Sequence, residues 1–349
     1  MTDFEPAPLP EQMVRARPGF GRILLASLGI ILVVVLGGAG AWVLTHQQRV
    51  NDQFVVWQYE PTATIAAYAE RSTMTGEGRF LFYASRPSIE STESFDTHCA
   101  SDIEDVGILG CYVHGDRKIF LFNVTDDRLD GLEEVVAAHE MLHAAWDRMS
   151  DTDHAAISPL LEAEASARAG DPAFVKTMEY YAKAEPGERL NELHSIVGTE
   201  FADISPELES HYATFFGERQ ALVQLHLTSD AVFTERQVAI SNIVDQTTTL
   251  KSSIDADYIS YNSGYDSLNA DITSFNVQAD EGGYFTQREF DNRREELVTR
   301  QADLDTLYAS IAERVAQYDG LVAQLDDLNA EVTELNQSIN IRPRTEGDS

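Results

Sequence analysis

Two histidines one helical turn apart, His139 and His143, are the residues of this chain whose types and spacing point most directly to chemistry. Residues four apart lie on one face of an α-helix, so the two imidazoles can bind one metal ion together. Glu140 follows the first histidine, where it can reach a water molecule on that metal as a general base. The alternative is a pair of hydrogen-bonded core histidines. We favour a metal centre, with zinc as the metal.

A helix has to position these side chains, and the surrounding sequence predicts one. Asp130 and Gly131 mark its start. Apolar residues and the two histidines then recur at helical spacing, at Leu132, Val136, His139, His143 and Trp146. Upstream, the aromatic-rich residues 79–84 and residues 118–124 predict two strands of a small sheet. The sheet would support the helix, and its edge could bind an extended peptide.

Two histidines do not complete a catalytic zinc site, which normally has three protein ligands. A third histidine six residues after His143 is excluded, because that position is Met149. A second predicted helix offers Glu192, His194 and Glu200. These three side chains point in different directions around the helix, so at most one of them can share the site. Spacing alone leaves that choice open.

The second helix also provides a resemblance to a known family. With the His139 helix, Asn191, Glu192 and Ser195 resemble the gluzincin zinc metallopeptidases, in which a glutamate on a second helix completes the site. The aspartate that commonly follows the serine is Ile196 here. The resemblance implies Glu140 as the base and three Zn²⁺ ligands: His139, His143 and Glu192. A residue that stabilises the oxyanion is also expected, and the available side chains are His194, His211, Tyr180 and Tyr181.

Charge and hydropathy predict a location. The formal net charge of −33 excludes a general nucleic-acid binder, which needs a basic surface. Residues 23–45 contain no charged side chain and can cross a bilayer core of about 30 Å. Arginines precede this segment within residues 15–22, whereas only Arg49 follows closely, which places the N-terminus in the cytoplasm. A signal peptide cleaved near residues 39–41 is the alternative.

The chain has two cysteines, Cys99 and Cys111, both on the predicted outer side of the membrane. An oxidising compartment favours a disulfide between them. The alternative is a second zinc site formed by both cysteines with His98 and His114.

The last third of the chain has a seven-residue apolar repeat, typical of a coiled coil. Its positions are Leu297, Leu304, Ile311, Tyr318, Leu325, Val332 and Ile339. A weaker repeat covers residues 240–275, and residues 279–283 between the two repeats form a turn signal. We expect an antiparallel hairpin, with a parallel coiled coil between chains as the alternative. The only histidine here is His226, and we assign no chemistry to this region.

These patterns predict an α+β protein with a zincin-like domain, made of a small sheet and the site helices, before a long coiled-coil hairpin. The expected segments are a cytoplasmic tail (1–22), a transmembrane helix (23–45), a linker (46–75), a metallopeptidase domain (76–216), the hairpin (217–341) and a tail (342–349).

The expected function is that of a zinc endopeptidase, anchored in the cytoplasmic membrane by one N-terminal helix, with its catalytic domain outside. Zinc-activated water would attack a protein or peptide substrate, with Glu140 as general base. The hairpin would bind a protein partner or a second copy of the chain. One alternative is a non-catalytic envelope scaffold with a structural zinc and an interacting coiled coil. Another is an adaptor protein that has a degenerate motif and binds no metal.

Overall fold

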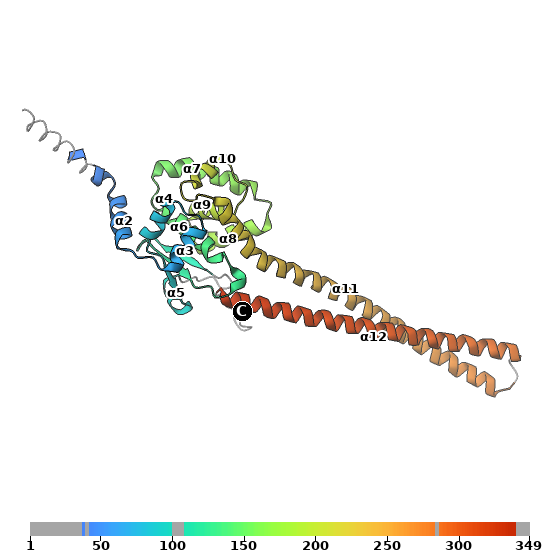
Figure 1. Cartoon of the computed structure of the whole chain (residues 1–349). Coiled ribbons are helices and arrows are strands. Elements are labelled where there is room, and N and C mark those ends of the chain that lie inside the picture. The colour runs from blue at the N-terminus through green and yellow to red at the C-terminus, as the bar shows by residue number, and fades with distance from the viewer. Residues whose placement is uncertain (1–36, 39–41, 100–107, 283–285, 340–349) are drawn as a thin grey trace, which may run out of the picture. The chain divides into compact units, whose positions relative to one another are not determined.

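The computed structural model describes residues 37–38, 42–99, 108–282 and 286–339, and these are divided into two compact units after Tyr59 (Figure 1). The first unit contains helix α2, Gln47–Gln58. The predicted cytoplasmic tail and most of the predicted transmembrane segment, 23–45, lie outside the described residues. Among the residues that are described, no helix is both long and apolar enough to span a membrane.

A three-stranded sheet belongs to the second unit. Its strands are β1 (Ser88–Glu90), β2 (Gly110–Val113) and β3 (Lys118–Phe122), in the order β1-β3-β2. β1 is parallel to the central strand β3, and β2 is antiparallel to it, with Cys111 opposite Phe120. The strand predicted within residues 118–124 is therefore confirmed, and β2 forms one edge of the sheet.

The strand predicted at residues 79–84 is wrong, because this segment belongs to helix α4, Gly76–Ala84. The hydroxyl of Thr75 accepts a hydrogen bond from the backbone N–H of Gly78 and caps the helix. Leu81 and Phe82 are buried in the main core. Aromatic residues have only a weak preference for strands, and here the cap and the packing of one helical face outweigh it.

Most of the second unit is helical. Before the hairpin, its other helices are α3 (Ala63–Arg71), α5 (Thr92–His98), the 3₁₀ turn η1 (Asp127–Leu129), α6 (Leu132–Trp146), α7 (Asp151–Ala167), α8 (Pro172–Ala184), α9 (Arg189–Thr199) and α10 (Pro206–Tyr212). In the sequence, a capping residue before a proline predicts helix starts at Pro159, Pro172 and Pro206. The starts at Pro172 and Pro206 are confirmed, each after a capping side chain. The start predicted at Pro159 is wrong, since Ser150 and Asp153 form a capping box that begins α7 earlier.

Helix α6 is central to the main core. Ala137, Ala138, Met141 and Leu142 are each completely buried. Its neighbours include α3, α4, α9 and strands β2 and β3. Helix α9 packs closely against it because Gly198 of α9 has no side chain: a methyl group at this position would lie 2.5 Å from a side-chain carbon of Leu142. This close packing brings two chemically functional helices together.

The C-terminal region forms two long helices, α11 (Arg219–Asp280, 62 residues) and α12 (Gln287–Ser338, 52 residues), which run side by side in Figure 1. Ion pairs join Arg236 to Glu331, Arg314 to Asp257 and Arg300 to Asp271. Residue numbers in these pairs increase along α11 while they decrease along α12. The two helices are therefore antiparallel, as the hairpin prediction requires. At its base, Leu222 of α11 is buried in the same core as α6. The boundary predicted between 216 and 217 stays a prediction.

Candidate metal centre

Helices α6 and α9 bring His139, His143 and Glu192 together. The Nε2 atom of His139 lies 3.8 Å from Oε2 of Glu192, and the Nε2 atom of His143 lies 3.5 Å from Oε1 of the same carboxylate. One donor atom from each residue lies within 4.8 Å of the other two. The two imidazole rings have their centroids 4.7 Å apart and are nearly perpendicular, with 77° between their planes. The cluster can therefore hold one metal ion.

The spacing of these donors suits a small tetrahedral ion. Ligand atoms about 2.0–2.1 Å from a tetrahedral zinc lie about 3.4 Å from one another. The distances to Oε1 and Oε2 of Glu192, 3.5 and 3.8 Å, are close to that value, and one donor from each residue lies within 4.8 Å of the others, so a bound ion would have to draw the three side chains together. Two imidazole nitrogens and one carboxylate oxygen are a common set of protein ligands in catalytic zinc sites.

Glu192 provides a second test of whether a cation fits here. Its side chain is completely buried, and neither carboxylate oxygen receives a hydrogen bond from an amide, hydroxyl or guanidinium group of the described residues. Burial raises the pKa of Glu192. Burial and the charge of Glu192 raise the pKa of nearby Glu185 to about 7. With only the carboxyl group of Glu185 as a hydrogen-bonding neighbour among the described residues, a buried carboxylate is costly, and a bound divalent cation would stabilise it.

Burial also favours the ligand form of both histidines. It lowers the pKa of His139 and of His143 to about 4, so both rings are neutral near pH 7. Nδ1 of His143 is 2.9 Å from Oδ1 of Asn191, and the amide nitrogen of Asn191 donates to Glu188 at 3.2 Å. Because the oxygen of Asn191 faces the ring, Nδ1 must be the protonated nitrogen, and the lone pair of Nε2 faces Glu192.

Asn191 is thus expected to orient a ligand, and its replacement tests this. Asn191→Leu keeps the volume of the side chain but removes the acceptor for His143, so metal affinity should fall about 10–100-fold. The matched control is Glu188→Gln, which alters only the outer contact of Asn191. Affinity can be measured by competition with a chelator of known strength. Equal affinities for the two variants would contradict an orienting role for Asn191.

Glu140 lies between the histidines and strand β2. Its side chain is buried, and its Oε2 atom has no hydrogen-bond partner among the described residues. Burial raises the pKa of Glu140 well above its usual value, the charges of Glu192 and Glu185 add to this, and a hydrogen bond from the backbone N–H of Tyr112 opposes it. One oxygen of Glu140 is therefore buried without a hydrogen-bond partner among the described residues, while the backbone of β2 holds the carboxylate in place.

The close approach of β2 depends on a glycine. A methyl group at Gly110 would lie 2.6 Å from Cγ1 of Val136 and 2.8 Å from Oε1 of Glu140. Gly110→Ala should therefore displace Glu140 while leaving the three metal-binding side chains in place. We expect unchanged metal content and at least about a tenfold loss of hydrolytic rate, since a small misplacement of a catalytic group is costly. Gly115→Ala is the matched control, because no atom lies within 4 Å of the added methyl group. Equal rates for the two variants would argue against the contact.

A cavity of about 580 Å³ opens onto the cluster. Its wall includes His139, Glu140, His143 and Glu192, the edge strand β2, and apolar side chains of the first half of α6. Tyr181 of α8 is another wall residue, and its ring centroid lies 6.5 Å from that of His139. A cavity of this size can enclose several residues of an extended peptide or a comparable small molecule.

The structure separates the side chains that sequence analysis left as alternatives. Glu200 lines the cavity, but the metal cluster in the described part of the chain contains Glu192 instead. His194 points elsewhere, with its Nε2 atom 2.8 Å from that of His211. Neither of these two histidines lines the cavity, whereas Tyr180 and Tyr181 do. Of the four side chains considered for stabilising an oxyanion, only the tyrosines are suitably placed.

Two features of the site were missed by sequence reasoning. Gly110 belongs to strand β2, which the sequence analysis did not predict, and no sequence signal marks its contact with Glu140. His226 belongs to the hairpin, to which we assigned no chemistry, yet it lines the cavity and its charge would lower the pKa of His139. The available signal was that His226 is the one histidine of this long helix.

The two cysteines form a disulfide, Cys99–Cys111, which confirms the favoured prediction. The alternative zinc site is excluded, because disulfide sulfurs are not thiolate ligands. The two flanking histidines have other contacts: the ring of His98 stacks on Phe120 at 4.1 Å, and that of His114 meets the edge of Tyr112 at 5.0 Å.

Comparisons with known protein families, with curated proteins and with solved structures found no match to this chain. The assignment of function therefore depends on the residues of the site.

Proposed function

We propose that this protein is a zinc-dependent endopeptidase. The observation that supports it most strongly is the convergence of His139, His143 and Glu192 beside Glu140 in one cavity. The geometry of these three side chains can bind a metal ion. Zinc is proposed because two imidazoles and one carboxylate are a donor set that zinc commonly has in hydrolases.

Bound zinc would polarise the scissile carbonyl and acidify a water molecule. Glu140 would take the proton of that water at Oε2, the oxygen with no partner among the described residues, and pass it to the leaving amine. A raised pKa makes the carboxylate a stronger base, which favours removal of the proton from the water. Asn191 keeps Nε2 of His143 directed at the site through the hydrogen bond to Nδ1.

Two further groups would bind the substrate. Strand β2 is an edge strand and lines the cavity, so an extended peptide could pair with its backbone. Tyr181 would hydrogen-bond the oxygen on which negative charge develops. Burial, followed by the charge of Glu192, raises the pKa of Tyr181 well above its usual value, so its hydroxyl keeps its proton and can act as a donor.

The number of ligands argues against a purely structural zinc. Structural sites normally have four protein ligands, whereas the metal cluster among the described residues has three. Glu140 would also have no purpose beside a structural ion. The scaffold function is therefore the weaker proposal.

We propose that the enzyme acts on the outer side of the cytoplasmic membrane, anchored by residues 23–45. The disulfide between Cys99 and Cys111 supports this location, since disulfides persist in oxidising compartments. The hairpin would bind a protein partner or a second copy of the chain, and its acidic composition disfavours nucleic acid.

A peptide-library digest tests this function directly. The full-length protein, purified in detergent because of its apolar N-terminal segment, should cleave internal peptide bonds. A chelator should stop cleavage, and added Zn²⁺ should restore it. Zinc-loaded protein that cleaves no peptide or denatured protein would contradict the proposal and would favour the scaffold.

A further inference from the structure

The first helix of the hairpin, α11, forms part of the cavity wall. Leu225 of this helix packs against the start of α6, where a methyl group at Gly131 would lie 3.1 Å from its side chain. Gly131 has φ of +94°, a conformation that glycine adopts without strain. The next residue of α11, His226, lines the cavity together with His139 and Glu140. The hairpin thus reaches the proposed active site.

The same helix is tied to α9, which provides Glu192. The guanidinium of Arg219, the first residue of α11, is almost completely buried. It donates to the carbonyl oxygens of Phe201 at 2.6 Å and Ala202 at 3.1 Å, just beyond the end of α9. These bonds fix the position of the first turn of α11 relative to the end of α9.

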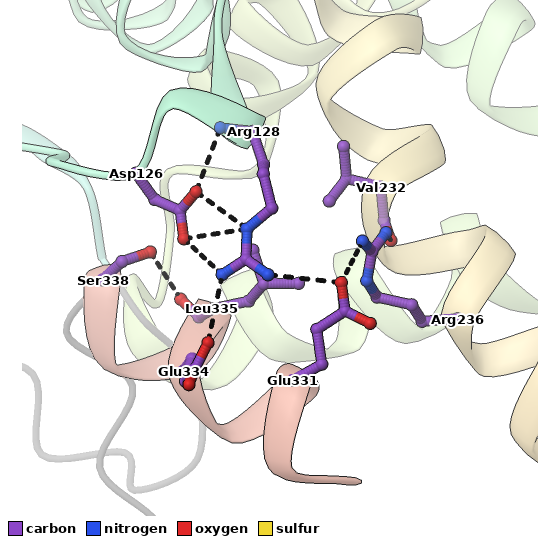
Figure 2. Close-up of polar contacts among 8 residues, drawn as sticks. All are labelled: Asp126, Arg128, Val232, Arg236, Glu331, Glu334, Leu335 and Ser338. Carbon is purple, nitrogen blue, oxygen red and sulfur yellow. Dashed lines mark hydrogen bonds and ion pairs between the residues drawn. The ribbon is translucent and has the colours of Figure 1, made fainter. Parts of the chain in front are cut away.

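Contacts of the last turns of α12, also at the base of the hairpin, hold α11 in place, as Figure 2 shows. Glu331 of α12 accepts hydrogen bonds from Arg236 of α11 and from Arg128 of η1, the latter at 3.2 Å. Leu335 of α12 is completely buried against Leu129 of η1. Exposed ion pairs contribute little to stability, so the apolar contact stabilises this packing more, and the ion pairs fix the register.

The ring of His226 has no hydrogen bond with any of the described residues, although it is half-buried and faces the cavity. Its nitrogen atoms are therefore free to bond a molecule in the cavity. A neutral imidazole has one donor and one acceptor, which match the C=O and N–H groups of a peptide. His226 is also outside the metal cluster found among the described residues, so metal binding does not account for it.

We propose that His226 is a substrate-binding residue of the site, hydrogen-bonded to the peptide backbone, and that the hairpin is therefore part of the active site. This inference rests on the proposed peptidase function. It assigns a chemical role to a region whose sequence pattern indicates only a coiled coil.

Three variants of the full-length protein test the inference. His226→Leu removes both hydrogen-bonding groups, and His226→Gln keeps a donor and an acceptor. Leu227→Ala is the control, because this neighbouring side chain is 45% exposed and does not line the cavity. For each protein we would measure zinc content, melting temperature, and kcat and KM for one peptide taken from the library. Calorimetry would give the affinity for a phosphonamidate dipeptide, whose tetrahedral phosphorus resembles the transition state.

We expect His226→Leu to keep its zinc and to lose about 10–100-fold in kcat/KM and in affinity for the phosphonamidate. His226→Gln should recover part of both losses, a rescue that a purely structural role would not give. If His226→Leu behaves like Leu227→Ala in both measurements, or if glutamine restores nothing, the inference is wrong while the peptidase function stands. A wild-type protein that cleaves no peptide and binds no phosphonamidate would overturn both.

Discussion

Replacing Glu140 with glutamine is expected to leave zinc bound and to slow peptide hydrolysis about 10²–10⁴-fold, the range that a general base contributes. Glutamine has nearly the same shape, so the packing against Gly110 and the bond from the Tyr112 N–H can be kept. The amide cannot accept the proton of the attacking water. The metal ligands His139, His143 and Glu192 are unchanged by this substitution.

The measurement is kcat for one library-derived peptide, with zinc content determined on the same samples. Gly115→Ala is a suitable control, since its added methyl group meets no atom within 4 Å. Equal cleavage by wild type and Glu140→Gln would remove Glu140 from the mechanism. Loss of zinc from the variant would instead assign Glu140 a structural part in the metal site.

Replacing Glu192 with glutamine is expected to weaken zinc binding by more than about 100-fold, because loss of an outer partner of a ligand already costs 10–100-fold. Glu192 lies 3.5 and 3.8 Å from the two imidazole nitrogens and is the only carboxylate in the cluster that the described residues form. An amide oxygen is a much weaker zinc donor than a carboxylate. Hydrolysis should be lost together with the metal.

Glu200→Gln is the matched control for this substitution. Glu200 lies on the same α9 segment and lines the same cavity, and burial raises its pKa to about 7, yet it is outside the metal cluster. Its variant should therefore keep zinc at wild-type affinity. The reverse result, with zinc lost from Glu200→Gln and kept by Glu192→Gln, would mean that the third ligand has been assigned to the wrong residue.

The part of the site that lies on one helix could be predicted from the sequence. The i, i+4 spacing of His139 and His143 is a local property, so their shared face follows from helix geometry. Glu192 required two helices to meet, and only the resemblance to gluzincins ranked it above Glu200. The structure brings Glu192 to the histidines because Gly198 lets α9 pack closely on α6, a contact with no sequence pattern of its own.

The fold was predictable to a similar extent. Capping residues before Pro172 and Pro206 predicted two helix starts, and the seven-residue repeat predicted the hairpin. The wrong predictions at residues 79–84 and at Pro159 have a common cause. Strand propensity and a proline are weak signals, and the capping side chains at the starts of α4 and α7 and the buried faces of these helices outweigh them. The place of His226 was not predictable, because it depends on how the base of the hairpin packs against η1 and α6.

X-ray absorption at the zinc edge on the full-length protein tests the central proposal most directly. The proposal predicts about one zinc per chain, with two imidazole nitrogens and a carboxylate oxygen about 2.0–2.2 Å from the metal. The imidazole signal should fall in His143→Ala. Protein without zinc, or zinc bound by sulfur at about 2.3 Å, would contradict the site described here.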